Sequence, residues 1–197
     1  TICHEHLEYY SLIQIDWIMK KAGLRIIDVE FNNVNGGSFA VTVCHKNSKL
    51  KPAPLKILKI LQHEKNIGLL NLKIFKNFSQ DVLNFKKNLR NFLLKKKKDG
   101  QKIFGLGAST KGNVILQYCN IKEDILPLIG EVNPEKFNKF TPGSSIKIIN
   151  ENDILKMKPD LLLILPWHFK DFFINSQKYK KFNLLFPLPK IHIVKKK

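Results

Sequence analysis

The sequence predicts an α/β chain whose C-terminal half is a parallel sheet, preceded by a helical connector and by a helix with a β-hairpin. Short apolar runs alternate with helical segments from about residue 99 onward, and the segment before them repeats apolar residues at helical spacing. Alternation of strand and helix is typical of a parallel sheet covered by helices on both faces. The predicted divisions are residues 1–50, 51–98 and 99–197.

The first division is expected to contain a helix and two strands. Ser11 can cap a helix whose apolar residues recur every three or four positions, and Gly23 offers a stop. Residues 24–31 and 38–44 are rich in Ile, Val and Phe and are predicted strands. The Asn- and Gly-rich segment 32–37 between them permits positive φ, so a hairpin is expected.

The second division is predicted to be helical in two pieces. Lys51-Pro-Ala-Pro54 breaks regular structure, and Gly68 interrupts the helical pattern that runs to Lys98. Apolar residues on the second piece step by three and four and therefore share one face: Phe75, Phe78, Val82, Phe85, Leu89 and Phe92. Such a stripe is more often core or helix contact than a cofactor site, so this segment is interpreted as a connector.

The third division carries the alternating pattern, after Asp99-Gly100 ends the connector. Predicted strands are 102–106, 128–132, 161–165 and 184–186, with helices after 111, near 151–157 and after 169.

Composition indicates a globular protein without a membrane span. Hydrophobic residues make up 44% of the chain and aromatic residues 10%, while runs such as Leu161–Leu165 are too short to cross a bilayer. The three cysteines lack metal-ligand spacing, and no secretory leader is recognisable. Neither a disulfide framework nor a metal site is therefore predicted. The expected compartment is the cytoplasm. Because the chain begins with Thr, it is interpreted as the interior of a longer protein.

The net charge of +18 raises the alternative of a basic nucleic-acid-binding protein. Of 34 basic residues only Arg25 and Arg90 are arginines, and the lysines are spread over most polar segments. Arginine is the better reader of bases and phosphates, and no nucleic-acid-binding motif is found. We therefore expect solvated lysines and no nucleic-acid partner.

A glycine-rich loop runs from Gly105 to Asn113 between a predicted strand and a predicted helix. Its backbone, the Ser109 and Thr110 hydroxyls and the Lys111 ammonium could bind a diphosphate. The loop lacks the full dinucleotide and P-loop spacings, and a tight strand-to-helix turn would also require small residues, so both interpretations stay open.

Other polar and turn residues follow further predicted strands. They are Asn133-Pro134, Thr141-Pro142-Gly143 and Pro166-Trp167-His168-Phe169. Open α/β sheets bind ligands at the carboxyl ends of their strands, so these segments are expected to line one crevice with the glycine-rich loop.

The beginning of the chain is crowded with titratable groups: His4, Glu5 and His6 stand beside Cys3, Glu8, Tyr9 and Tyr10. A carboxylate can orient a neighbouring imidazole, which makes a general base a natural interpretation. A histidine satisfied within the core is the other interpretation, and residue types alone do not decide between them.

Several of these motifs, in order, resemble the sugar C-methyltransferases that use S-adenosylmethionine. They are Ile2–Tyr10, Val34-Asn-Gly-Gly-Ser38, Gly105–Asn113, Val132-Asn-Pro-Glu-Lys136, Thr141-Pro-Gly143 and Lys158–Phe169. The resemblance implies that residues 1–50 are the terminal helix and hairpin of a class I methyltransferase domain, and 99–197 a Rossmann-like sugar-nucleotide-binding domain. It also implies that the S-adenosylmethionine loop and a zinc-binding module lie upstream, so that this chain alone is an inactive fragment.

The family methylates the carbon beside the ketone of a nucleotide-linked keto-deoxysugar, through loss of an α proton and attack of the enolate on a methyl group. By this resemblance His6 is the expected base and Glu5 its helper. The nucleotide-diphosphate sugar is expected to contact Gly107, Ala108, Ser109, Thr110, Lys111, Asn113, Asn133, Pro142, Gly143, Trp167 and His168.

Three positions depart from the pattern and put the substrate in doubt more than the reaction. Cys3 stands where several relatives have tyrosine, Ala40 near an arginine position and Phe172 at an acidic one. A noncatalytic nucleotide-sugar-binding module remains the alternative function. An NAD(P)-type oxidoreductase is disfavoured because Glu131 is expected before the end of its strand, where it could not bind a ribose.

Overall fold

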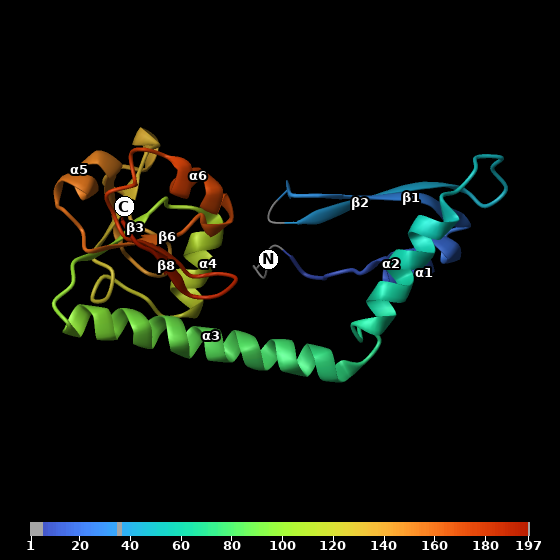
Figure 1. Cartoon of the computed structure of the whole chain (residues 1–197), viewed down its shortest axis with the longest axis horizontal. Coiled ribbons are helices and arrows are strands. Elements are labelled where there is room, and N and C mark those ends of the chain that lie inside the picture. Colours follow the sequence, from blue (N-terminus) through green and yellow to red (C-terminus); the bar gives the residue numbers. More distant parts are fainter. Residues whose placement is uncertain (1–5, 35–36, 197) are drawn as a thin grey trace. The chain divides into compact units, whose positions relative to one another are not determined.

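The structure is a computed structural model that describes residues 6–34 and 37–196. The chain forms two compact units, Thr1–Asp81 and Val82–Lys197, and each is described by itself. Figure 1 traces both along the sequence.

The N-terminal unit contains helix α1 (Leu12–Lys21), strands β1 (Leu24–Asn32) and β2 (Ser38–His45), and helix α2 (Pro54–Asn66). The strands pair antiparallel, with an irregularity between Ile26 and Asp28, which confirms the predicted hairpin. Leu12, Ile26 and Val29 are buried between these elements and form a small core.

A carboxylate from α2 caps the N-terminus of helix α1. The buried Glu64 side chain accepts hydrogen bonds from the backbone N–H groups of Leu12 at 2.6 Å and of Ile13 at 2.8 Å. The first N–H groups of a helix lack intrahelical acceptors and favour negative charge. Glu64 therefore links α2 to the N-terminus of α1 through these two hydrogen bonds.

Helix α3 (Leu72–Lys98) confirms the second predicted helical piece and crosses the division between the units. Its apolar stripe packs in the C-terminal part of the helix, where Leu89 and Leu93 are buried and Phe85 and Phe92 lie against them. The prediction of one continuous packed face is corrected at the N-terminal part, because Phe75 and Phe78 are 50% and 55% exposed.

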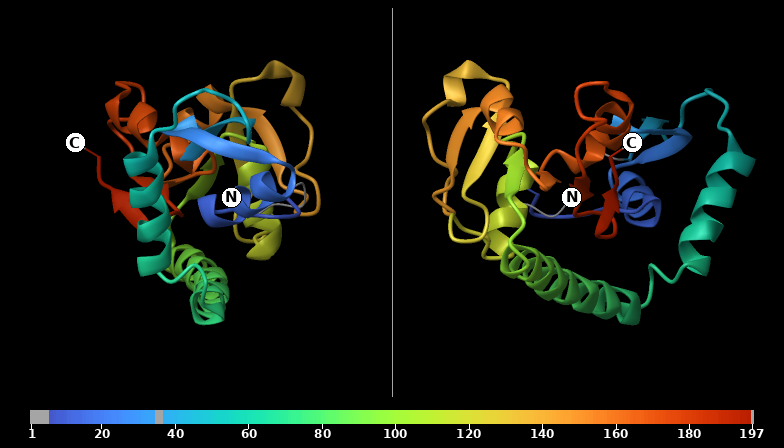
Figure 2. Two further views of the ribbon diagram at one scale, coloured as in Figure 1. Left: turned by 90° about the vertical axis from the view of Figure 1, so that its right-hand side faces the viewer. Right: turned by 60° about the vertical axis from the view of Figure 1, so that its left-hand side comes forward.

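The C-terminal unit is built on a six-stranded sheet in the order β5-β4-β3-β6-β7-β8. Its strands are β3 (Ile103–Leu106), β4 (Leu128–Glu131), β5 (Lys147–Asn150), β6 (Leu161–Ile164), β7 (Leu184–Phe186) and β8 (His192–Val194). All neighbours are parallel except β7 and β8, which confirms the predicted parallel α/β class. Figure 2 shows the sheet from two further directions.

Helices cover both faces of this sheet. They are α4 (Thr110–Tyr118), α5 (Glu151–Lys156) and α6 (Lys170–Asn175), with short 3-10 turns η2 (Pro134–Lys136) and η3 (Trp167–Phe169). Residues of α3 and α4 share one buried cluster with the sheet, and residues of α5 and α6 share another. Burial of apolar area on two faces is the main source of stability in such a fold.

Two strands were not predicted from sequence. The strand β5 is the short segment Lys-Ile-Ile-Asn, and β8 has only three residues after the proline-containing turn that follows Phe186, so neither has a long apolar run. The boundary between the two compact units falls inside α3, and Leu89 and Leu93 of this helix join the core of the sheet.

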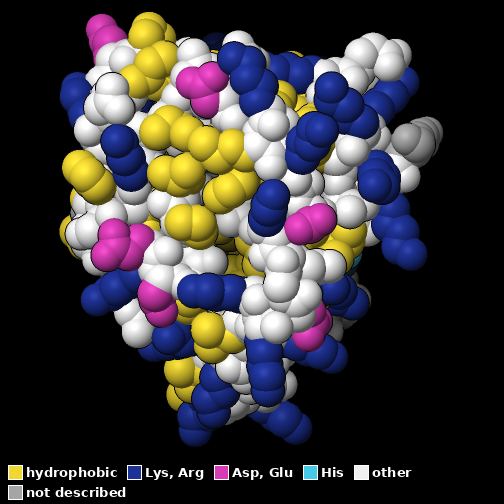
Figure 3. Space-filling model, turned by 90° about the vertical axis from the view of Figure 1, so that its left-hand side faces the viewer, with side chains coloured by type: hydrophobic (Ala, Val, Ile, Leu, Met, Phe, Trp, Pro, Cys, Tyr) yellow, Lys and Arg dark blue, Asp and Glu magenta, His cyan; other side chains and the backbone are white. Residues whose placement is uncertain are grey.

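Lysine side chains are spread over the surface. Figure 3 shows one face on which Lys and Arg are dispersed among apolar and uncharged side chains, with few acids. None of the described helices is long and apolar enough to cross a membrane.

Candidate functional site

The strand order reverses between β3 and β6. The chain proceeds from β3 to β4 and β5 on one side and then crosses to β6 on the other. Open α/β sheets bind ligands at such a switch point, outside the carboxyl ends of the strands. The loops after β3 and after β6 therefore flank the candidate crevice of this unit.

Glycines let these two loops approach each other. Gly107 has φ +78°, and a Cβ there would lie 2.7 Å from Cδ and Cγ of Pro166. A Cβ on Gly112 would lie 2.6 Å from Cβ of Leu165. The close-packing interpretation of these glycines is thus supported by geometry, whichever ligand the loop binds.

The loop after β3 is fixed by a buried carboxylate at the end of β4. Glu131 accepts hydrogen bonds from the backbone N–H groups of Ala108 and Val132, both at 2.8 Å, and of Asn133 at 3.0 Å. Lys136 donates from Nζ to the Ala108 carbonyl at 2.9 Å and lies 3.5 Å from Glu131 Oε2. Four neighbours therefore hold one carboxylate.

These contacts lower the pKa of Glu131. Burial by itself raises the pKa of this carboxyl, but the hydrogen bonds from Asn133 and Val132, the charge of Lys136 and the hydrogen bond from Ala108 outweigh it. Glu131 is ionised at neutral pH.

Helix α4 begins at the same edge of the sheet, directly after β3 and its loop. Ser109 caps it, because its Oγ accepts from the Gly112 N–H at 3.1 Å and its carbonyl accepts from the Asn113 N–H at 2.9 Å. The hydroxyl hydrogen of Ser109 can still be donated to a ligand.

Trp167 and His168 follow β6 at the same edge of the sheet, with their ring centroids 5.6 Å apart. Burial lowers the pKa of His168, and the charge of nearby Lys111 lowers it further, so the imidazole is neutral at pH 7. His168 Nδ1 and Asn113 Oδ1 are buried atoms with no hydrogen-bond partner among the described residues. Buried polar atoms without a partner are costly, so these two are candidates for contacts with a bound ligand.

The family model described as the C-methyltransferase C-terminal domain matches residues 33–189. The chain belongs to this family. It is also 27% identical over 180 residues to the C-methyltransferase NovU of Streptomyces niveus, a match that covers 90% of this chain and 42% of that protein. The chain thus spans less than half the length of this relative.

In this C-methyltransferase C-terminal domain the β3, β4 and β6 ends bring most predicted binding residues to one edge of the sheet. Gly107 to Asn113 lie in the loop and first turns of α4, Asn133 follows β4, and Trp167 and His168 follow β6. Asn133 accepts from the Glu135 N–H at 3.0 Å and so caps the turn η2. Ligand contacts of these residues stay a prediction.

Pro142 and Gly143 lie elsewhere, which corrects the expectation that their turn follows the end of a strand. Their turn precedes the amino end of β5, where the Thr141 N–H donates to the Ile146 carbonyl. Gln117, near the end of α4, donates to the Pro142 carbonyl at 2.8 Å. Because β5 was not predicted, the turn was assigned to the wrong end of a strand.

His6 belongs to the N-terminal unit and is exposed, with its ring 6.2 Å from that of Tyr9. The alternative of a histidine buried in the core does not describe His6. Glu5 and Cys3 lie outside the described residues.

Sequence reasoning missed Glu131 and Lys136 as residues of the crevice. The structure places Glu131 as the last residue of β4, which corrects the expected position before the strand end. The oxidoreductase alternative remains disfavoured for a different reason, since the carboxylate is already bound by backbone N–H groups. The Val132–Lys136 motif was the signal that could have drawn attention to Lys136.

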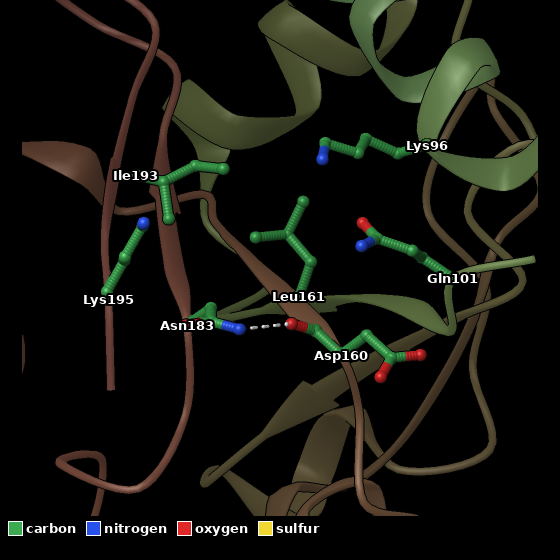
Figure 4. Close-up of a pocket in the computed structure, with 7 residues that line it drawn as sticks. All are labelled: Lys96, Gln101, Asp160, Leu161, Asn183, Ile193 and Lys195. Atoms are coloured by element: carbon green, nitrogen blue, oxygen red, sulfur yellow. Dashed lines mark hydrogen bonds between the residues drawn. The ribbon is translucent and has the colours of Figure 1, made fainter. Parts of the chain in front are cut away.

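A cavity of about 260 Å³ opens at the amino ends of the strands (Figure 4). It is lined by Lys96, Gln101, Asp160, Leu161, Asn183, Ile193 and Lys195, and so by none of the predicted binding residues that the structure describes. Among residues 6–34 and 37–196, no cluster of three or more His, Cys, Asp or Glu side chains could hold a metal ion.

Proposed function

We propose that this chain is part of a C-methyltransferase that acts on a nucleotide-linked keto-deoxysugar, and that its C-terminal unit holds the nucleotide diphosphate. The observation that supports this best is the family match, which covers strands β3 to β7 and the switch point between β3 and β6. The NovU relative is named a C-methyltransferase, in agreement with the reaction class.

The crevice suits an anionic ligand with polar groups. Ser109 can donate from its hydroxyl, and Lys111 carries its ammonium on the first turn of α4. Asn113 Oδ1 and His168 Nδ1 can bind polar groups of a nucleotide, and Trp167 offers an aromatic surface beside them. Aromatic and polar groups that converge in one crevice are typical of nucleotide sites.

His6 is proposed as the base that removes the proton next to the sugar ketone, with Glu5 as its helper. The exposure of His6 leaves its imidazole accessible to a substrate. General-base catalysis typically contributes about 10²–10⁴ in rate. In the assembled enzyme, His6→Gln is therefore expected to lower kcat at least about 100-fold, while His63→Gln, at an exposed position on α2, leaves it unchanged.

The proposed methyl donor is S-adenosylmethionine, which supplies an electrophilic methyl group. In the C-terminal unit the acid at the end of β4 has no acceptor left for the ribose hydroxyls of its adenosine, so the contact by which dinucleotide-binding sheets hold adenosine is not offered. We infer that this unit binds the sugar nucleotide, held through its diphosphate and not through its ribose hydroxyls.

Calorimetry tests this function. Thymidine diphosphate is expected to bind the chain, whereas S-adenosylmethionine, adenosine monophosphate and a short DNA duplex are not expected to bind at high salt. Tight binding of S-adenosylmethionine, or DNA binding that survives high salt, would overturn the proposal. Diphosphate binding together with an assembled enzyme that is indifferent to His6→Gln would favour the noncatalytic binding module.

A further inference from the structure

We propose that Glu131 and Lys136 are a positioning pair that shapes the crevice for a diphosphate and closes the position where related folds bind a ribose. The inference deepens the proposed function and rests on it, because it assigns the cause of the ligand preference of the same crevice.

The position of Glu131 is the first step of the argument. In dinucleotide-binding sheets an acid near the end of the strand beside the glycine loop accepts hydrogen bonds from ribose hydroxyls. Glu131 ends β4, which pairs with β3, and so occupies that position. Its side chain is only 8% exposed.

The hydrogen bonds of Glu131 are the second step. A carboxylate offers about four acceptor sites. Backbone N–H groups of Ala108, Val132 and Asn133 fill three, and the Lys136 ammonium lies at 3.5 Å from Oε2. The acid therefore holds the protein's own loop and has no acceptor to offer to a ribose diol.

Lys136, in contrast to Glu131, keeps a hydrogen-bond donor that a ligand can use. Its ammonium has three hydrogens, and the Ala108 carbonyl at 2.9 Å and Glu131 account for two. The side chain is 42% exposed, so a ligand can reach the remaining donor. Because Ala108 immediately precedes Ser109, the charge of Lys136 lies on the loop that begins α4 and supports an anion there.

Two consequences distinguish this pair from structural residues. Affinity for a nucleoside diphosphate depends on the charge of Lys136, and affinity does not depend on a ribose 2′-hydroxyl. Uridine diphosphate and 2′-deoxyuridine diphosphate, which differ only in that hydroxyl, are expected to bind the chain with affinities within about threefold of each other.

Calorimetry on the full chain and three variants tests the inference. Lys136→Met is expected to weaken thymidine diphosphate binding about tenfold, whereas Lys136→Arg keeps it within about threefold. Lys139→Met, at a neighbouring exposed lysine, is the matched control and leaves affinity unchanged. Thermal unfolding checks that each variant is folded.

The outcomes separate the two proposals. If the unmodified chain binds no nucleoside diphosphate, the proposed function fails and this inference fails with it. If the unmodified chain binds but Lys136→Met binds equally well, or if uridine diphosphate binds about tenfold tighter than its deoxy counterpart, only the positioning pair is overturned. The comparison of the two uridine nucleotides needs no variant and so decides the ribose part whether or not Lys136→Met folds.

Discussion

The backbone N–H of Ala108 donates a 2.8 Å hydrogen bond to the buried carboxylate of Glu131. Ala108 follows β3, and Glu131 is the last residue of the neighbouring parallel strand β4. This bond therefore connects the loop that begins α4 to the end of β4. An ionised acceptor inside a protein forms a stronger bond than a neutral one and is costly to remove. The shape of the candidate crevice therefore depends on the charge of one acid.

The first prediction concerns pH. The pKa of Glu131 lies below its ordinary value of 4.5 in the folded protein, so ionisation of this group stabilises the fold above that value. The stabilisation is lost as pH falls below 4.5 through the folded pKa. Glu131→Gln is thus expected to lower the free energy of unfolding at about pH 7, and the difference from the unmodified protein shrinks toward about pH 3.

Urea unfolding across that range measures the difference, and Glu135→Gln, at an exposed position on η2, is the control. A difference for Glu131→Gln that stays constant down to the lowest pH would show that its charge does not matter.

The second prediction concerns close approach of the loops. Gly107 and Gly100 both have positive φ, +78° and +77°, but a Cβ meets Pro166 at 2.7 Å only at Gly107 and nothing within 4 Å at Gly100. Alanine at Gly100 is expected to cost only backbone strain, about 1 kcal/mol. Gly107→Ala must in addition displace Pro166, and it is expected to lower the free energy of unfolding by about 2–4 kcal/mol. Equal unfolding free energies for the two variants would contradict the packing argument.

The third prediction concerns the N-terminal unit. Glu64→Ala removes the acceptor for the Leu12 and Ile13 N–H groups and is expected to destabilise α1 by about 1–3 kcal/mol. Hydrogen exchange of these two amides should accelerate accordingly. Glu30→Ala, at an exposed position on β1, should leave their exchange unchanged, and equal effects of the two variants would argue against capping by Glu64.

The fourth prediction concerns a buried hydrogen bond near α5. Tyr179 donates from its hydroxyl to both oxygens of the buried Glu151, at 3.0 and 3.1 Å, and Lys178 pairs with the same carboxylate. Burial and then the charge of Glu151 raise the pKa of Tyr179, so the phenol stays protonated and remains a donor.

Tyr179→Phe should lower the free energy of unfolding by about 1–2 kcal/mol, because Glu151 keeps only Lys178 as a side-chain partner among these groups. Tyr118→Phe, at a residue 38% exposed, should change it by less than about 0.5 kcal/mol. Thermal unfolding compares the two variants, and an equal small effect would mean that the bond to Glu151 contributes nothing.

Apolar patterning was sufficient to predict α3, β3 and β6. The apolar spacing of α3 extends over 27 residues, β6 consists only of Leu and Ile, and β3 is apolar apart from Gly105. The strand β5 also has four residues, but Lys147 and Asn150 leave it only two apolar ones, and without it the Pro142–Gly143 turn was assigned to the wrong edge of the sheet. Short strands are stabilised by their neighbours, which a local pattern does not contain.

The candidate site was predictable where a motif carried it. The glycine-rich loop and Trp167-His168 could be placed at strand ends because they directly follow apolar runs. The role of Glu131 depends on three backbone groups, one of which, Ala108, is distant in sequence. Such a contact follows from the pairing of β3 with β4 and could not be inferred from residue type alone.

The most direct test of the account is a magnetic resonance titration of the ¹⁵N-labelled chain with thymidine diphosphate. The account predicts that the amides of Ser109, Lys111 and Gly112 and the indole N–H of Trp167 shift on binding, while Gln101, Asp160 and Asn183 at the amino-end cavity do not. Shifts confined to the cavity residues, or no shift at saturating nucleotide, would contradict the claim that the switch-point crevice holds the nucleotide diphosphate.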